Sequence, residues 1–352
     1  MGRVDDYIQE TLLRENIPGL SVAVMRVGEP LLLCGYGLAN VEHSVPAMAQ
    51  TVYEIASVGK TFTAFVVMML VEEGAIDLEG AIADYIEDLP EAWRSVKVRH
   101  ILSHQSGLPN YTKVDNYWTE VCWAQLSRTE VVDLVRDQPL LFEPGTYSSY
   151  DNTGYFLLGI MLEKVAGCAY GELMRSRLFE PLGMSATRLN NYDEIVPHRA
   201  SGYRWVDGKL VNKPYYSSSV TFSGGGHLSS IEDMVKYEQE LLNPTLLKQS
   251  TLELMWTYQP PSSGETWEAE NYAAHLRAGL GWLMPDYAGK HVVGHNGSIV
   301  GFASNITRFI DEGITVVLFC NLDKVVRPDA LAKEIVGYYS TAIADVSIQP
   351  PL

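Results

Sequence analysis

A serine and a lysine lie three residues apart where a helix is predicted to begin. They belong to the segment Ser57-Val58-Gly59-Lys60, and the apolar residues after it recur at helical spacing until Gly74, which predicts a helix over 57–73. Side chains three residues apart lie on one face of a helix. An unprotonated Lys60 could therefore take the proton of the Ser57 hydroxyl, leaving an oxygen that can attack a carbonyl. Taken alone, the pair is equally compatible with a helix-capping serine and a solvated lysine.

A phenol and a carboxamide precede a second apolar helix pattern. Tyr150 and Asn152 open the segment Tyr150-Asp151-Asn152-Thr153-Gly154-Tyr155-Phe156-Leu157-Leu158-Gly159, which follows Phe142-Glu143-Pro144-Gly145 after four residues. Neighbouring cations can shift a phenol from its usual pKa of about 10 toward phenolate, which can then relay protons. Asn152 offers a donor and an acceptor to a substrate amide or ester. The alternative is a tyrosine that bonds within the core beside a helix-capping asparagine.

These segments resemble the Ser-x-x-Lys and Tyr-x-Asn motifs of the serine β-lactamase and penicillin-binding-protein superfamily, in its class C β-lactamase-related branch. The segment over 293–302, which contains His295-Asn296-Gly297-Ser298, is similar to the family's third motif, a strand bearing Lys-Thr-Gly or His-x-Gly. This chain has the His-x-Gly form. Residues 98–108, 179–184 and 224–234 also resemble the family. The matches run from about residue 17 to residue 323 in the family's order.

The resemblance implies a role for each motif. Ser57, Lys60 and Tyr150 would be the catalytic residues, with Ser57 forming an acyl-enzyme and either Lys60 or Tyr150 acting as the base. Gly297 would leave room for substrate along its strand, and the backbone N–H groups of Ser57 and Ser298 would form the oxyanion hole. His295 would hold the Tyr150 phenol in place. The substrate-binding residues would be Asn152, His295, Gly297 and Ser298.

The expected fold is of the α/β (α+β) class, in a single β-lactamase-like domain over 1–352. It combines an antiparallel β-sheet, flanked by N- and C-terminal helices, with an inserted, mainly helical subdomain. The sheet part would comprise about 1–76 and 200–352, and the helical part about 77–199. Local patterns predict a hairpin with strands over 20–27 and 31–37 around a turn at 28–30. Further strands are predicted over 291–293, 301–309 and 314–321, followed by a final helix over 328–344.

Composition narrows the partners. The chain has 352 residues, with 43 acidic and 26 basic side chains and a net charge of −17, which repels polyphosphates, so nucleic acid is not an expected partner. Apolar runs such as 64–71 and 314–320 are far shorter than the roughly 20 residues that cross a bilayer, so no membrane segment is expected. The first residues lack the pattern of a secretory signal, which favours a cytoplasmic protein.

Neither a metal nor a cofactor is expected. The cysteines show no C-x-x-C pair and no histidine spacing typical of zinc, so they are predicted to be buried, reduced thiols. No Gly-x-Ser-x-Gly elbow is present, and no lysine follows the glycines at 224–226 to bind phosphate. The four cysteines are Cys34, Cys122, Cys168 and Cys320.

The third motif bears on the substrate. His295 is mostly neutral near pH 7, so it would hold the carboxylate of a β-lactam less firmly than the lysine of penicillin-recognising relatives. This favours an esterase or a D-amino-acid amidase or peptidase that acts on a small ester, an amide or a short peptide. A β-lactamase or D,D-carboxypeptidase is one alternative, and a sensor acylated without turnover, or an inactive binding protein, is another. The oligomeric state stays open.

One residue departs from the family pattern. Asp151 occupies the middle position of Tyr-x-Asn, where relatives usually carry a small residue such as serine or alanine. A carboxylate near Lys60 would favour the protonated amine, so Asp151 is expected to point away, or the role of base passes to Tyr150. Three histidines are expected to pack and bond loops instead of taking part in the chemistry: His100, His104 and His227.

Overall fold

A six-stranded antiparallel sheet runs through one half of the molecule. The computed structural model describes residues 3–267, 276–287, 289–323 and 328–344. Within these ranges the strand order is β3-β2-β1-β11-β10-β9, and neighbouring strands are antiparallel throughout. The predicted fold class is confirmed. The strands are β1 (Gly19–Arg26), β2 (Glu29–Asn40), β3 (Val45–Pro46), β9 (Val292–Ile299), β10 (Phe302–Phe309) and β11 (Ile314–Cys320).

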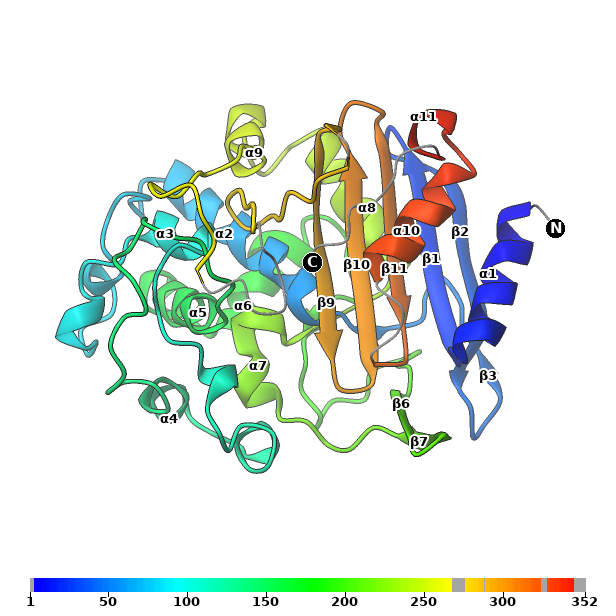
Figure 1. The fold of residues 1–352 in the computed structure, drawn as a ribbon, viewed down its shortest axis with the longest axis horizontal. Coiled ribbons are helices and arrows are strands. Elements are labelled where there is room, and N and C mark those ends of the chain that lie inside the picture. The colour runs from blue at the N-terminus through cyan, green and yellow to red at the C-terminus, as the bar shows by residue number, and fades with distance from the viewer. Residues whose placement is uncertain (1–2, 268–275, 288, 324–327, 345–352) are drawn as a thin grey trace.

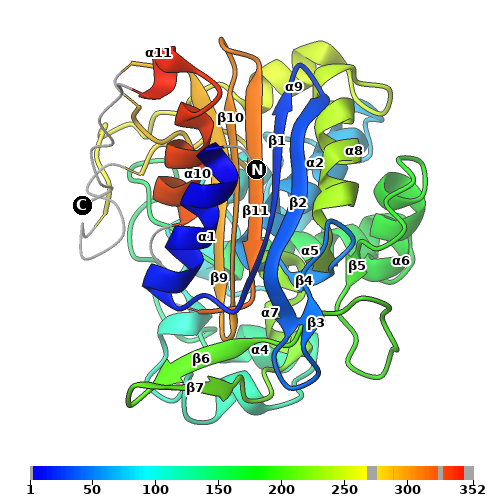
Figure 2. The same ribbon diagram turned by 90° about the vertical axis from the view of Figure 1, so that its right-hand side faces the viewer.

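Helices cover both faces of this sheet. The N-terminal helix α1 (Arg3–Glu15) and the C-terminal helix α10 (Pro328–Gly337) lie on one face, and α8 (Ile231–Leu242) lies on the other (Figures 1 and 2). Seven of the eight residues of β1 are therefore buried, as its nearly continuous apolar sequence predicts. The other half of the molecule is mainly helical, and the edge strand β9 is the strand of the sheet that lies beside it (Figure 1).

The predicted bounds of three elements were wrong: the first hairpin turn, the strand β9 and the last helix. The hairpin between β1 and β2 turns at Val27-Gly28, where both residues have a positive φ, 50° and 79°. Such two-residue turns match the twist of paired strands, so Pro30 falls inside β2 instead of in the turn. The edge strand β9 extends to Ile299 and so includes the third motif. The last helix ends at Gly337, and a separate short helix, α11, spans Thr341–Ala344.

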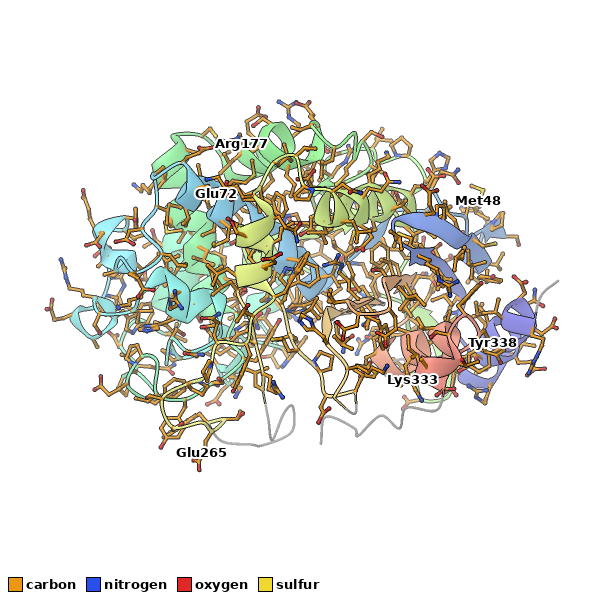
Figure 3. The ribbon with its side chains drawn as sticks, turned by 90° about the horizontal axis from the view of Figure 1, so that it is seen from above. Met48, Glu72, Arg177, Glu265, Lys333 and Tyr338 are labelled. Carbon is orange, nitrogen blue, oxygen red and sulfur yellow. The ribbon has the colours of Figure 1, made fainter. Side chains whose placement is uncertain are left out.

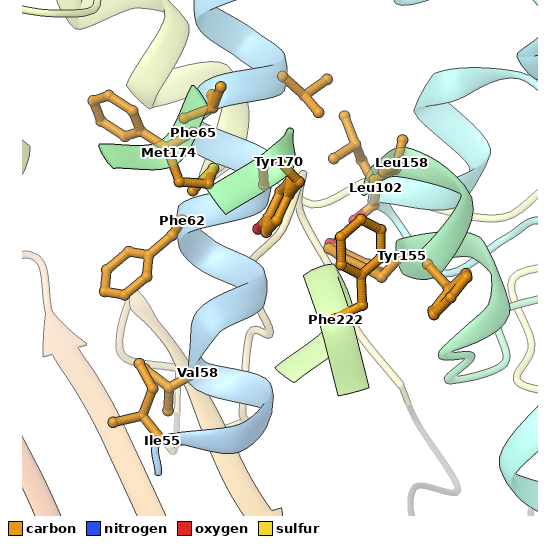
Figure 4. Packing of buried hydrophobic residues seen from close by; sticks show 14 of the residues in the cluster. Ile55, Val58, Phe62, Phe65, Leu102, Tyr155, Leu158, Tyr170, Met174 and Phe222 are labelled. Atoms are coloured by element: carbon orange, nitrogen blue, oxygen red, sulfur yellow. The ribbon is translucent and has the colours of Figure 1, made fainter. Parts of the chain in front are cut away.

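The helical half is built around α2 (Gly59–Glu72), in which residues 59 to 70 are all buried. Helix α5 (Thr153–Ala166) and helix α7 (Ser218–Gly225) pack against it. In Figure 4, Phe62 and Val58 project from one side of α2, while Tyr155 and Phe222 lie on the other. A helix buried all round places any polar side chain it carries out of contact with bulk water.

Shorter elements complete the chain. The strands are β4 (Tyr53–Glu54), β5 (Arg188–Leu189) and β8 (His227–Ser229), which form a small sheet, and the hairpin of β6 (Tyr203–Val206) and β7 (Lys209–Asn212). The helices are α3 (Val98–Leu102), α4 (Arg128–Asp133), α6 (Tyr170–Met174) and α9 (Gln249–Met255).

The sheet separates two hydrophobic cores. The larger lies between the sheet and the helical half and includes residues of both, from Ala23 to Phe319. The smaller lies under α1 and α10. At its rim the rings of Tyr7 and Tyr338 lie 5.5 Å apart and join α1 to the turn after α10, where Figure 3 labels Tyr338. The larger core therefore joins the sheet and the helical half of the molecule in one continuous interior.

The described part of the chain contains no disulfide, no membrane-spanning helix and no group of three potential metal ligands. All four cysteines are free; Cys122 and Cys320 are buried, whereas Cys34 and Cys168 are only partly buried, so the expectation of four buried thiols was half wrong. No helix in the described ranges is both long and apolar enough to cross a membrane. In those same ranges, no three side chains of His, Cys, Asp or Glu are grouped as a metal site would require.

A buried ion pair ties α8 to the sheet. The guanidinium of Arg308 in β10 donates to Glu238 through Nε at 2.8 Å and Nη2 at 3.2 Å, and the hydroxyl of Thr315 in β11 donates to the same carboxylate at 2.8 Å. Both charged side chains are at most 3% exposed. Removing one partner of such a pair leaves the other charge buried without compensation.

We therefore expect Glu238→Ala to lower the free energy of unfolding by about 3–5 kcal/mol, measured by urea denaturation. Glu232→Ala, the same change on the same helix at a position that is only partly buried, should cost less than about 1 kcal/mol. Equal losses in the two variants would show that the ion pair is not the source of the effect.

Candidate active site

Ser57 lies where the small sheet passes into α2. A single helical turn, Ala56–Val58, precedes the helix, and Ala56 adopts a positive φ of 46°. The carbonyl oxygen of Ile55 accepts a hydrogen bond from the Ser304 hydroxyl of β10 at 2.6 Å, which fixes this turn against the large sheet. Non-glycine residues with positive φ persist only where the surroundings hold them. Ser57 is therefore held in a constrained turn between the two halves of the molecule.

The Lys60 amine has three polar neighbours. Its Nζ lies 3.2 Å from Ser57 Oγ, donates to Asn152 Oδ1 at 2.8 Å and donates to the carbonyl oxygen of Gly224. A neutral amine has two N–H groups and one lone pair. Because the two oxygen acceptors use both N–H groups, the lone pair is left for the Ser57 hydroxyl. These neighbours can therefore serve the uncharged amine, with its lone pair toward Ser57, as well as the ammonium, which would donate to all three oxygens.

Burial also favours the uncharged amine. The Lys60 side chain is fully buried, and desolvation lowers its pKa to about 7, against a smaller opposing effect of Asp151. A neutral Lys60 is then accessible near pH 7. A direct ion pair would stabilise the ammonium by roughly 4 kcal/mol at an effective dielectric constant of about 20, enough to reverse most of that shift.

The Asp151 carboxylate bonds to groups other than Lys60. It accepts from the Ser106 hydroxyl and from the Gly154 backbone N–H, both at 2.9 Å, so it caps the start of α5. The pKa of Asp151 is raised to about 6, chiefly by burial. No ion pair joins it to Lys60 among the described residues.

Tyr150 lies beside the amine without bonding to it. Lys60 Nζ is 5.1 Å from the centre of the phenol ring. The Tyr150 hydroxyl is buried and makes no hydrogen bond of good geometry to a described residue. Burial raises its pKa, and the neighbouring Ser57 opposes that rise only in part. Burial therefore favours the neutral phenol at Tyr150.

His295 is also neutral. Its Nδ1–H donates to the carbonyl oxygen of Asn296 at 2.7 Å, so Nε2 carries the lone pair. Burial, followed by the proximity of Lys60, lowers the His295 pKa to about 3. The rings of His295 and Tyr150 are centred 6.0 Å apart, but no bond joins them, and Nε2 has no partner among the described residues. The expectation that His295 holds the phenol is thus not met in this conformation.

The Ser298 backbone faces the open edge of the sheet. Gly294 exchanges two N–H···O bonds of 2.9 Å with Leu283, on the side away from β10. The pairing of β9 with β10 continues without a shift from Val292 to Ile299. Alternate residues of a paired strand present their backbone groups to the same side. The N–H of Ser298, four residues after Gly294, therefore points outward, as an oxyanion donor must.

Gly297 is required by close packing. A Cβ atom there would overlap the Ser304 hydroxyl and the Ile55 carbonyl oxygen and would come within 3.1 Å of the Ser57 backbone nitrogen. The absence of a side chain lets β9 approach the turn that carries Ser57. From the sequence, this glycine was expected to make room for substrate. In the structure, it first of all allows the close contact between β9 and the turn that carries Ser57.

Two neighbours of Lys60 and Tyr150 were missed. The carbonyl of Gly224 was overlooked because only its glycine-rich segment, and no backbone acceptor, is visible in a sequence. His104 lies under the Tyr150 phenol, with ring centres 4.4 Å apart, and its Nδ1 accepts from the Asp151 N–H at 3.4 Å. Its segment was noticed, but the histidine was expected only to pack loops.

The other two histidines make their hydrogen bonds to residues other than Ser57, Lys60 and Tyr150. His100 Nδ1 accepts from the Lys97 backbone N–H. The His227 ring packs against Gly59, and its Nε2 is 3.1 Å from the Tyr170 hydroxyl, which is 2.8 Å from that of Thr63. Thr63 in turn donates to the carbonyl oxygen of Ser223, next to Gly224. This chain of bonds supports the segment that binds Lys60.

The fold is that of the serine β-lactamases and penicillin-binding proteins. The family model described as Beta-lactamase matches residues 4–337, and the chain belongs to that family. Penicillin-binding protein 4* of Bacillus subtilis (strain 168) is 26% identical over 333 residues, which cover 90% of this chain and 70% of the relative.

Two solved structures are similar over nearly the whole chain. The octameric penicillin-binding protein homologue from Pyrococcus abyssi has a TM-score of 0.84 and 27% identity, covering 96% of this chain and 77% of that one. The D-amino acid amidase from Ochrobactrum anthropi SV3, complexed with D-phenylalanine, has a TM-score of 0.80 and 26% identity, covering 96% of this chain and all of the other, 100%. The family and these neighbours indicate an enzyme that is a hydrolase.

Gly297→Ala tests the contact between β9 and the Ser57 turn. We expect a loss of about 1–3 kcal/mol in unfolding free energy from overpacking. Displacement of the Ser57 N–H should lower kcat/KM for an activated ester by about 100-fold. Gly171→Ala is the matched control, because an added Cβ there meets only ordinary contacts at 3.4 and 3.5 Å. A fully active Gly297→Ala enzyme would contradict this account of the glycine.

Proposed function

We propose that the protein is a serine hydrolase that forms an acyl-enzyme on Ser57. The single observation that carries this proposal is the Lys60 amine, fully buried, with its two N–H groups taken by oxygen acceptors and its remaining position directed at Ser57 Oγ 3.2 Å away. An uncharged amine in that geometry is a general base within reach of the proton it must remove.

Acylation then follows from the positions of the groups. Ser57 Oγ attacks the substrate carbonyl carbon, and its proton passes to Lys60 Nζ. The backbone N–H groups of Ser57 and Ser298 donate to the developing oxyanion. Tyr150, kept as a neutral phenol by burial, gives its proton to the leaving group and recovers one from the Lys60 ammonium.

Deacylation repeats these steps with water as the nucleophile. Water gives up a proton to the base and attacks the acyl carbon, and Ser57 leaves with a proton returned to its oxygen. Asn152, whose Nδ2 donates to Thr112 at 3.3 Å, stays anchored beside the amine and contacts the substrate amide or ester.

A small amide or ester is the substrate class that fits His295. With Nδ1–H bound to Asn296, the ring offers an unprotonated Nε2 to the site and no positive charge. A carboxylate at that position would meet a lone pair. The similar amidase structure was solved with D-phenylalanine bound, which supports a D-amino-acid amide as one member of this class.

Ser57→Ala and Lys60→Met should each reduce kcat for a short-chain p-nitrophenyl ester by about 1,000-fold or more, because members of one catalytic unit fail together. Intact-mass measurement should find an acyl or fluorophosphonate adduct on the wild-type chain and none on Ser57→Ala. Ser185→Ala and Lys164→Met, at exposed positions, are the controls and should stay active. An adduct that persists without turnover would instead indicate an acylated sensor.

A panel of substrates tests the proposed class. We expect kcat/KM for nitrocefin, which carries a carboxylate, to fall at least about tenfold below those for a p-nitrophenyl ester and a D-alanyl anilide, because a charge-assisted bond of roughly 1.5–3 kcal/mol is missing. Steady-state rates at one pH give the comparison. Preference for nitrocefin would favour the β-lactamase alternative.

A further inference from the structure

Asp151 is a buried carboxylate with no cation in contact. It is 2% exposed, and its two oxygens accept from Ser106 and Gly154. No Lys or Arg of the described chain lies within ion-pair distance of it. Burying an unpaired charge is costly, so a carboxylate in this place calls for a reason beyond helix capping, which a neutral side chain could supply.

Asp151 directly precedes Asn152, whose Oδ1 accepts from Lys60 Nζ at 2.8 Å, and it is the one charged group of the described chain that raises the Lys60 pKa. The rings of Tyr150 and Tyr155 lie 5.1 and 5.3 Å from the amine, and burial raises the pKa of both phenols, which keeps them neutral. Three buried histidines are close enough for Lys60 to lower their pKa further, and all three stay neutral: His104, His227 and His295.

We propose that Asp151 is a positioning residue that acts through Lys60, supplying the negative charge that stabilises the Lys60 ammonium formed during acylation. In that step the Ser57 O–H bond breaks, the bond from Oγ to the carbonyl carbon forms, the proton joins Lys60 Nζ, and the carbonyl electron pair moves to the oxyanion. The inference rests on the proposed function.

The anchoring of the carboxylate explains how it can do this without disabling the base. Ser106 and Gly154 hold Asp151 toward the start of α5, so it forms no ion pair with the amine. Its field therefore favours the ammonium moderately, and burial still leaves a substantial neutral fraction of Lys60 at pH 7. The Asp151 charge therefore stabilises Lys60 mainly after the amine has accepted the Ser57 proton.

The test compares Asp151→Asn and Asp151→Ser with the wild type. The wild-type kcat/KM should rise with pH through about pH 7, because neutral Lys60 is the active form. Both variants lack the charge, so the Lys60 pKa falls, and this rise should move down by about one pH unit. The plateau should drop about tenfold or more, because the base is weaker and its ammonium less stabilised.

Asp151→Glu is the matched control, since it changes the side chain at the same position and keeps a carboxylate. Its pH profile should show no downward displacement. A profile unchanged in both uncharged variants, or displaced downward equally in Asp151→Glu, would overturn the proposal. Asp151→Ser serves if Asp151→Asn does not fold, as judged by circular dichroism.

A titration that needs no turnover separates this proposal from the proposed function. Carbon-13 NMR of lysine labelled at Cε, with the Lys60 signal assigned by its loss in Lys60→Met, reports the Lys60 pKa directly. A lower pKa in Asp151→Asn shows that Asp151 stabilises the Lys60 ammonium, and it would do so even if the proposed acylation of Ser57 failed its own test. An unchanged pKa refutes it even if the enzyme is an active serine hydrolase.

Discussion

The site depends on a lysine that the fold prevents from being fully charged. Lys60 is buried within a helix that is itself buried, and the oxygen acceptors of Asn152 and Gly224 occupy both N–H groups of its neutral form. Desolvation is the larger influence on its pKa, and the field of Asp151 opposes it. The Lys60 pKa is thereby lowered to about 7, within the range in which the proposed base could both accept a proton and return it.

Three separate parts of the chain must meet for this to occur. Helix α2 brings the amine, the start of α5 brings Asn152 and the phenol, and the segment that ends α7 brings the Gly224 carbonyl. The edge strand β9 then closes the arrangement against the Ser57 turn, which a side chain at Gly297 would prevent. The strain at Ala56 is held by the Ser304 bond to the neighbouring carbonyl of Ile55. The chemistry therefore rests on contacts between the two halves of the molecule.

The sequence predicted those helices, strands and motifs that are determined by neighbouring residues. The spacing of Ser57 and Lys60, the helix that follows them and several strands could be predicted because periodicity and side-chain chemistry lie in neighbouring residues, whereas the antiparallel sheet as a whole was expected from the family resemblance. The turn at Val27-Gly28 was missed because a valine with positive φ is an unusual residue for it. The Gly224 carbonyl and the stacking of His104 on Tyr150 could not be predicted, since both depend on tertiary contacts between distant segments.

The exchange of bonds between Leu283 and Gly294 has a further effect on the outer margin of β9. An exposed margin of a sheet is a template on which another polypeptide can hydrogen-bond, and proteins commonly shorten or block it. Here Leu283 occupies both main-chain groups of Gly294, and the His295 imidazole takes the oxygen of Asn296. Among the described residues, what remains outward is a short stretch near Ser298, too brief to recruit a foreign strand into an aggregate yet sufficient to present a donor to a single oxygen atom.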